Sequence, residues 1–284
     1  MFSVLIPVGP AEADVRRLTY VLESLRRHER ASEIQLILID DAPSPRRLEQ
    51  HSGSEWHSAD VIHTPIWKRG RPDPYTAMTV GTICGLRVAS PAATFVLKLD
   101  TDALVIGQFS GQLKSEFATD HRLGILGSYD RTCTGGLRDW SLWVPVLRRT
   151  TRRLSLRSPR KVSSARRLLR AALTNSEYKL GAHCLGGAYA VGPALAARHD
   201  LLDWKPWVGS GLGEDVVMGV LCAAAGLRMR SMTAVGEPFG LAYTGLAGTP
   251  EWLRQRGHSI VHAVKDSDAE VEAELRERLQ AAVS

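Results

Sequence analysis

The sequence predicts an α/β fold in which a mostly parallel central sheet has helices on both faces. Short apolar runs recur at 3–8, 34–39 and 94–99, as in strands that are buried on both faces. Amphipathic segments separate these runs, and the alternation of strands with helices is typical of a parallel sheet. The chain has 284 residues, of which 44% are hydrophobic and 23% charged, which excludes a disordered, collagen-like or coiled-coil protein.

The first three elements follow from the apolar patterning. Residues 3–8 form a strand-sized apolar run that ends at a Gly-Pro pair. Residues 12–29 repeat apolar side chains at helical spacing and predict a helix. Residues 34–39 are a second apolar run, which the turn sequence 40–43 stops.

Three further elements complete the first hundred residues. Residues 59–63 predict a short strand, and the Pro-Asp-Pro sequence 72–74 then breaks the chain. A helix is expected over 75–88, and a strand over 94–99 ends in Asp100-Thr101-Asp102. In sheets of this kind ligands bind outside the carboxyl ends of the strands, so the polar residues there are candidates for chemistry.

The second half is less regular. Residues 123–128 predict a strand, and 184–191 predict another that is rich in small residues. Residues 214–225 and 267–281 predict helices. Because no Gly/Ser-rich linker separates the halves, we expect one domain.

Charge is concentrated in one segment. The net charge is +6, and residues 148–170 contain ten Lys or Arg but no Asp or Glu. This segment is interpreted as a solvated insertion, or as a contact for an anionic membrane surface, an anionic acceptor or nucleic acid. The sequence argues against nucleic acid because no aromatic platform accompanies the basic residues.

A cytoplasmic location, with peripheral contact to the inner face of the membrane as an option, is expected. The N-terminus shows no basic region followed by a cleavage site, and no apolar run reaches the roughly 18–20 residues needed to cross a bilayer. The four cysteines lie far apart, without a CxxC pair, which fits a reducing compartment.

Carboxylates follow two of the predicted strands. Asp40 and Asp41 follow one strand, and Asp100 and Asp102 follow another. Two carboxylates at this spacing can gather on one hard cation that bridges to phosphates. Alternatively, the aspartates cap backbone amides of a loop.

The sequence Glu214-Asp215 stands at the expected start of a helix. The helix dipole keeps carboxylates ionised there, which suits a general base, although a plain acidic helix start has the same pattern. Gly186-Gly187 lies inside a strand pattern, where it marks either the close approach of a ligand or another backbone, or a bulge.

Histidines near the end of the chain are candidates for the same cation. His258 or His262 can complete a metal site that carboxylates begin, and the nearby Lys265 can neutralise a phosphate. Both histidines can equally be structural. Trp204 and Trp207 are candidates for stacking on a sugar ring, with core packing as the alternative.

The order of these motifs resembles that of nucleotide-sugar glycosyltransferases of the GT-A fold, with a family 2-like first half. The motifs are Ser3-Val4-Leu5-Ile6-Pro7-Val8, Ile39-Asp40-Asp41-Ala42-Pro43-Ser44, Leu99-Asp100-Thr101-Asp102, Gly186-Gly187-Ala188-Tyr189-Ala190-Val191 and Glu214-Asp215-Val216. The last two are similar to the acceptor half of the fringe and β-1,3-galactosyltransferase type. Each motif is short, and their order is the specific part.

The resemblance implies a single GT-A domain over 1–284. Its nucleotide-sugar-binding half would be 1–110 and its acceptor half 111–265, the latter with the basic insertion 148–170. A C-terminal helix would occupy 266–284. Gly9-Pro10 departs from the aromatic-Asn pair of many family 2 members, and the basic insertion has no counterpart in the family pattern.

The implied activity is that of an inverting, metal-dependent hexosyltransferase. It would move a sugar from a UDP-sugar to a hydroxyl of a glycan, a lipid-linked molecule or a small molecule. Asp215 would be the general base, and Glu214 would hold the acceptor or the donor sugar. Asp100, Asp102 and His262 would hold Mn²⁺ or Mg²⁺, with His258 as the reserve ligand.

The resemblance also implies a set of donor contacts. Asp40 or Asp41 would contact the uracil or ribose, and Gly187 would let the donor sugar lie close to the backbone. Apart from the resemblance, Lys68, Arg69 and Arg71 stand on a loop before the predicted helix 75–88, where they can reach the diphosphate or base or simply be solvated. The expected donor-binding residues are Pro7, Val8, Asp40, Asp41, Arg69, Asp100, Gly187, Trp207 and Lys265.

Two other functions remain open. A nucleotidyltransferase uses a similar sheet and metal, but it usually carries a Gly-rich basic loop after the first strand, whereas residues 9–14 here are acidic. The other is a non-catalytic protein whose basic segment docks on membranes or RNA. The sequence names neither the donor sugar, the acceptor and linkage, nor the oligomeric state.

Overall fold

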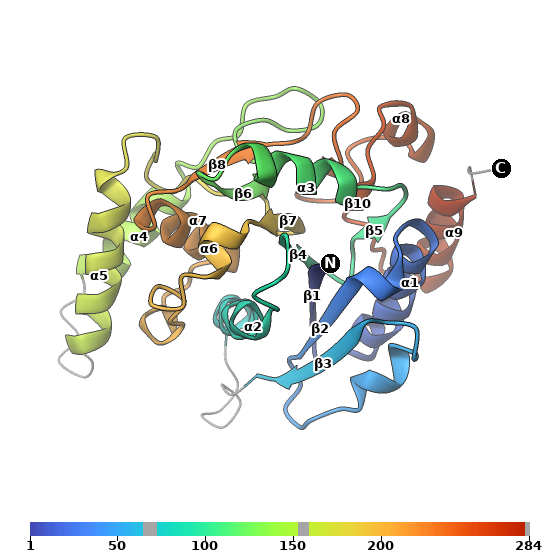
Figure 1. Ribbon diagram of the computed structural model, residues 1–284, viewed down its shortest axis with the longest axis horizontal. Helices are drawn as coiled ribbons and strands as arrows, with labels where there is room; N and C mark the ends of the chain where they lie inside the picture. The colour runs from blue at the N-terminus through green and yellow to red at the C-terminus, as the bar shows by residue number, and fades with distance from the viewer. Residues whose placement is uncertain (65–72, 153–158, 282–284) are drawn as a thin grey trace.

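A mostly parallel sheet forms the centre of the molecule (Figure 1). The computed structural model describes residues 1–64, 73–152 and 159–281. The strands are β1 (Phe2–Val8), β2 (Ile34–Asp40), β3 (Ser58–His63), β4 (Val96–Leu99), β6 (Leu123–Gly127), β7 (Ala188–Val191) and β8 (Arg228–Ser231). Their order is β3-β2-β1-β4-β7-β6-β8, and β7 alone runs antiparallel to its neighbours within this described sheet. The predicted fold class is confirmed.

Helices cover both faces of this sheet. They are α1 (Glu12–His28) and α3 (Ser110–Thr119) on one face, and α2 (Pro74–Val88), α5 (Pro159–Thr174) and α7 (Glu214–Ala224) on the other. Alternate residues of β1 point to opposite faces, so Val4 packs with Leu18 of α1 while Leu5 packs with Ile83 of α2. Burial on both faces explains why the strands are continuous apolar runs.

A second, short sheet lies beside the ends of the first. It consists of β5 (Leu104–Val105), β9 (Phe239–Leu241) and β10 (Ile260–His262), with β10 in the middle. These strands were not predicted, because two or three residues carry no recognisable periodicity. Since β5 follows β4 after a turn, its pairing with β10 brings the end of the chain to the carboxyl end of β4.

The remaining helices are α4 (Trp143–Arg152), α6 (Pro193–Ala196), α8 (Pro250–Gln255) and α9 (Ala269–Gln280), and the 3₁₀ turns are η1 (Ala31–Glu33), η2 (Leu48–His51) and η4 (Lys205–Trp207). Helix α9 lies beside α1 (Figure 1), where the buried Glu272 accepts hydrogen bonds from Arg17 and Arg276. This network fixes the segment that follows β10.

The expected strand over 184–191 was too long. Only Ala188–Val191 forms β7, and the preceding residues form turns. Gly186 and Gly187 form the turn just before β7 begins. A glycine pair has no side chains that could pack and stabilise a strand.

The described parts of the basic segment, 148–152 and 159–170, belong to helices α4 and α5. Leu147 of α4 and Leu168 and Leu169 of α5 are buried in the core. Arg148 and Arg167 are exposed on the same helices, so these cations lie on a solvated face. None of the described helices is both long enough and apolar enough to cross a membrane.

Candidate active site

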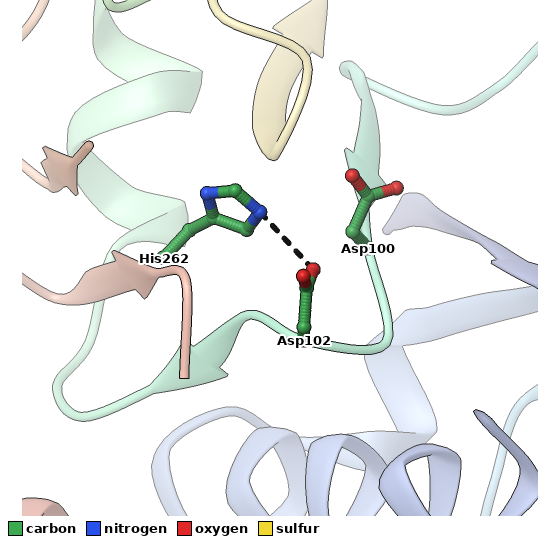
Figure 2. A group of neighbouring side chains, drawn as sticks. All are labelled: Asp100, Asp102 and His262. Atoms are coloured by element: carbon green, nitrogen blue, oxygen red, sulfur yellow. Dashed lines mark ion pairs between the residues drawn. The ribbon is translucent and has the colours of Figure 1, made fainter. Parts of the chain in front are cut away.

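Three side chains from distant parts of the chain converge at the end of β4. The possible ligand atoms of Asp100, Asp102 and His262 all lie within 4.8 Å of one another (Figure 2). The two aspartates occupy the turn after β4, and His262 is the last residue of β10. Pairing of β10 with β5 places the imidazole there. The cluster can therefore hold a divalent cation.

Hydrogen bonds orient the imidazole of His262 toward the aspartates. Its Nδ1 lies 3.0 Å from the carbonyl oxygen of Ala242, so Nδ1 carries the proton and donates it. Nε2 faces Oδ1 of Asp102 at 3.1 Å. A metal-binding histidine commonly has its other nitrogen held in this way. Burial lowers the pKa of His262, but the contact with Asp102 and the nearby Asp100 raise it above its ordinary value, so that Nε2 can carry a proton and donate it to Asp102. A bound cation would take the place of this proton and receive the lone pair of Nε2.

The charges around the cluster act on its carboxyl groups differently. Burial disfavours the ionised form of Asp102, but His262 and the ammonium of Lys265, 2.6 Å from Oδ2, together lower its pKa. Burial raises the pKa of Asp100 to about 6, although Lys98 opposes the shift. A bound cation would favour the ionised forms of both carboxyl groups.

Gly187 leaves room for the imidazole of His262. A Cβ atom on Gly187 would lie 2.3 Å from Cγ of His262, and real Cβ atoms do not approach so closely. His262 fills the space that this glycine leaves, and the expectation that a donor sugar approaches the same backbone stays a prediction. His262 lies far from Gly187 in the chain, so the sequence around Gly187 gives no sign of this contact.

Lys98 is a site residue to which the sequence analysis assigned no role. Its side chain is 1% exposed, and Nζ lies 2.6 Å from Oδ1 of Asp100 and 2.9 Å from Oε1 of Glu214. Nζ also donates to the carbonyl oxygen of Gly186. The sequence feature that could have identified Lys98 is its place inside an otherwise apolar strand, because a charged side chain buried there needs a partner of opposite charge. Lys98 joins the cluster at β4 to the start of α7.

Glu214 and Asp215 begin α7 but have different surroundings. Glu214 accepts the hydrogen bond from Lys98, so its carboxylate is held as part of the buried ion pair. Asp215 uses Oδ1 to accept from the backbone N–H of Val216 at 2.8 Å. Burial raises the pKa of the Asp215 carboxyl group, which makes its carboxylate a stronger base.

Oδ2 of Asp215 lies 3.5 Å from Nε2 of His183. Nδ1 of His183 donates to the carbonyl oxygen of Gly181 at 2.7 Å, and Nε2 accepts from Arg138. Burial lowers the pKa of His183 to about 4, so the ring is neutral near pH 7. His183 therefore does not donate a proton to Oδ2, because Nδ1 carries its only N–H and Nε2 accepts from Arg138.

A cleft of about 270 Å³ opens beside the cation cluster, which consists of the possible cation ligands Asp100, Asp102 and His262. Its lining includes apolar side chains from β1, β2 and α2 and charged groups from the cluster. The residues most relevant to a ligand are Pro7, Arg17, Ile39, Asp41, Ala77, Met78, Asp100, Asp102 and Lys265. Arg17, Ala77 and Met78 were not predicted, because each stands on a helix without a local motif.

Of the two aspartates at the end of β2, Asp41, the residue after the strand, is the one that lines the cleft. Its Oδ1 accepts a hydrogen bond from the hydroxyl of Thr64 at 2.9 Å. Asp40 is buried instead and accepts from both the guanidinium and the backbone N–H of Arg46. Val8 is also buried and accepts from Arg46 through its carbonyl oxygen, so it shapes the turn through its backbone.

Several other candidate residues do not join this site. Trp207 is 1% exposed and packs in the core, so the expectation that it stacks on a ligand is corrected. Trp204 packs against the same core. His258 donates to the carbonyl oxygen of Glu237 and lies outside the cation cluster. Arg69, with Lys68 and Arg71, lies outside the described residues.

Comparisons with known proteins indicate the fold. No family model matches the chain, and no curated protein matches its sequence. The structure is similar to that of the galactosyltransferase LgtC in complex with donor and acceptor sugar analogs, with a TM-score of 0.52 and 12% identity over 100% of this chain and 97% of that one.

Two further solved structures are similar at lower scores. Mouse xyloside xylosyltransferase 1 has a TM-score of 0.47 and 13% identity, over 92% of this chain and 96% of that one. S. aureus TarS 1-349 has a TM-score of 0.46 and 13% identity, over 98% of this chain and 70% of that one. The likeness to LgtC supports the GT-A fold for this chain.

Proposed function

We propose that the protein is a metal-dependent, inverting glycosyltransferase that moves a sugar from a UDP-sugar to a hydroxyl acceptor. The observation that carries the proposal is the cluster of Asp100, Asp102 and His262 beside a cleft, in a fold shared with a galactosyltransferase. Asp215 follows Glu214 at the start of α7, and Lys98 links Glu214 to Asp100. The site thus contains groups that could hold a metal-bound diphosphate and a carboxylate that could deprotonate an acceptor hydroxyl.

The cleft suits a nucleotide. Pro7, Ile39 and Met78 provide apolar surface for the flat face of a base. Asp41, oriented by Thr64, can accept a hydrogen bond from an N–H of the base or a hydroxyl of the ribose. Lys265, which also lines the cleft and pairs with Asp102, provides positive charge that would neutralise part of the charge of a diphosphate.

The residues of the cluster fit a divalent cation. Two carboxylates and a neutral imidazole are ligands that Mn²⁺ and Mg²⁺ accept, and the imidazole favours Mn²⁺. When bound, the cation would neutralise the charge that develops on the departing diphosphate. Asp100 and Asp102 would hold it from β4, and Ala242 would keep His262 in the required orientation.

Asp215 would remove the proton from the acceptor hydroxyl. Its Oδ2 is the oxygen not used by the backbone of α7, and the neutral His183 beside it leaves it able to accept a proton. General base catalysis of this kind typically contributes about 10²–10⁴-fold. Attack from the face opposite the diphosphate would invert the anomeric centre. Glu214, held by Lys98, would fix the start of α7.

The proposal is tested by release of UDP from a panel of UDP-sugars, with Mn²⁺ and with a chelator, in the absence of an acceptor. We expect slow metal-dependent hydrolysis of at least one UDP-sugar, and its loss in Asp102→Asn. Lys205→Met, a change outside the cation cluster and the lining of the cleft, is the control and should leave hydrolysis unchanged. Release of pyrophosphate from nucleoside triphosphates instead of UDP would support a nucleotidyltransferase. Absence of both activities and of calorimetric UDP binding would contradict the proposal.

We also propose a peripheral contact between α4, α5 and an anionic membrane. The support is the face with exposed Arg148, Arg149, Arg167 and Arg170. Sedimentation with phosphatidylcholine vesicles, with and without phosphatidylserine, tests it. Binding that needs phosphatidylserine and weakens with salt is expected, and equal recovery with both vesicles would contradict it.

A further inference from the structure

Three aromatic rings form a row that reaches the proposed base. Tyr75 and Trp143 have ring centroids 6.3 Å apart and meet edge to face. Trp143 and His183 are 6.4 Å apart, also edge to face. His183 is in turn the neighbour of Oδ2 of Asp215. The rings come from the starts of α2 and α4 and from the turn before β7, so only the fold assembles them.

The outer end of this row is open to solvent. Tyr75 is 49% exposed, and Leu142, the residue before Trp143, is 75% exposed. Trp143 is partly buried and meets Tyr75 edge to face, so the two rings form one aromatic surface that solvent reaches at Tyr75.

The backbone holds Tyr75 close to the start of α7. Asp73 caps α2 by accepting from the N–H of Thr76, and the hydroxyl of Thr76 accepts from the N–H of Gly209 in the loop before α7. A Cβ atom built on Gly213 would lie 3.9 Å from Tyr75 and 2.6 Å from Oδ1 of Asp215. One glycine therefore separates the exposed ring from the base.

The same stretch of chain borders the donor cleft. Pro74 and Ala77, on either side of Tyr75 in α2, both line it. A ligand on Tyr75 would consequently lie between the donor cleft and Asp215, which is where an acceptor must lie for transfer. Trp207 is buried, whereas Tyr75 and Trp143 place aromatic rings beside this cleft.

Resting on the proposed glycosyl transfer, we infer that Tyr75 and Trp143 form an acceptor subsite for a pyranose ring, so that the acceptor is itself a carbohydrate. The C–H groups on one face of a pyranose are apolar and fit an aromatic ring, whereas its hydroxyls remain free for polar contacts. A simple alcohol or a serine side chain offers no such face. The aromatic row therefore selects a glycoside.

The transfer step balances with these groups. The acceptor oxygen forms a bond to the anomeric carbon as the bond between that carbon and the diphosphate oxygen breaks. The electron pair leaves with the diphosphate, and the hydroxyl proton passes to Oδ2 of Asp215. The products are the new glycoside and UDP.

The inference is tested with Tyr75→Ala, Tyr75→Phe and the control Leu173→Ala, a comparably exposed apolar residue of α5. The acceptor probes are methyl glucoside, galactoside, mannoside and N-acetylglucosaminide, compared with glycerol and a serine peptide. We expect transfer to a pyranoside. In Tyr75→Ala the acceptor KM should rise by about tenfold, with acceptor-independent UDP-sugar hydrolysis unchanged. Tyr75→Phe and Leu173→Ala should match the wild type.

A binding measurement keeps the two proposals separable. Saturation-transfer NMR on the protein with UDP and Mn²⁺ reports contact between a methyl pyranoside and protein rings without any turnover. Pyranoside signals that Tyr75→Ala removes would support the subsite even if no UDP-sugar were hydrolysed, which would count against the proposed function alone. Transfer to glycerol or peptide in preference to every pyranoside would overturn the inference, as would equal pyranoside binding by Tyr75→Ala and the wild type.

Discussion

Replacing Lys98 by methionine should destabilise the protein strongly, because it leaves the buried Glu214 and the partly buried Asp100 without their cation. Nζ lies 2.6 Å from Asp100 and 2.9 Å from Glu214, and it also donates to a backbone carbonyl. Removing one partner of a buried, hydrogen-bonded ion pair costs about 3–5 kcal/mol. For a chain of this size the melting temperature should fall by roughly 10 °C. Methionine keeps most of the side-chain volume, so the loss is electrostatic.

Calorimetry or urea unfolding measures this loss. The matched control is Lys114→Met, since Lys114 pairs with Glu33 at 3.1 Å but is 31% exposed. Water and salt screen such a pair, and little change in stability is expected. An equal fall in both variants would refute the claim that burial makes Lys98 special.

A double-mutant cycle shows whether Lys98 and Glu214 are coupled. Glu214→Gln removes one of the two negative charges that Lys98 neutralises. In the Lys98→Met background this change should therefore cost less than in the wild type, with a coupling energy of about 1–3 kcal/mol. Additive losses would show that the contact contributes no coupling. The ion pair between Lys98 and Glu214 would then not be what links β4 to α7.

Three other predictions concern individual side chains. Gly187→Ala should expel the imidazole of His262 and weaken Mn²⁺ binding at least tenfold in a calorimetric titration, because the new Cβ would overlap the ring. Asp215→Asn should retain UDP binding and lose transfer by about 10²–10⁴-fold, measured as kcat with saturating donor. His183, whose pKa falls from 6.5 to about 4 on burial, should make the folded state less stable as pH falls. Between pH 7 and pH 5 its contribution is about 2 kcal/mol, because the unfolded chain binds the proton first. His183→Gln should flatten the pH profile by that amount in urea unfolding.

Each of these has a control or a contrary outcome. Gly111→Ala places a methyl group where nothing lies within 4 Å, so metal binding should be unaffected. Unchanged Mn²⁺ affinity in Gly187→Ala would contradict the packing argument. Full turnover by Asp215→Asn would exclude it as the base. Parallel pH profiles for the wild type and His183→Gln would show that the imidazole titrates alike in both states.

Local sequence was sufficient for much of the scaffold. β1, β2 and β4 are apolar runs because both of their faces are buried, and this burial is visible in the residues themselves. The positions of Asp100 and Asp102 followed from the end of β4, since a strand that stops in two aspartates places them at the edge of the sheet. The helix that starts at Glu214 was likewise visible from its glycine and acidic first turn.

The partners of those residues depended on contacts between remote segments. His262 reaches Asp102 through β10, a strand of three residues whose stability comes from ladders with β5 and β9 rather than from its own pattern. Lys98 meets Glu214 across 116 positions of the chain. Trp207 is in the core while Tyr75 is exposed, although both are aromatic residues beside turn sequences. Spacing and propensity describe a residue's own segment, whereas burial and ion pairing depend on the segments that pack against it.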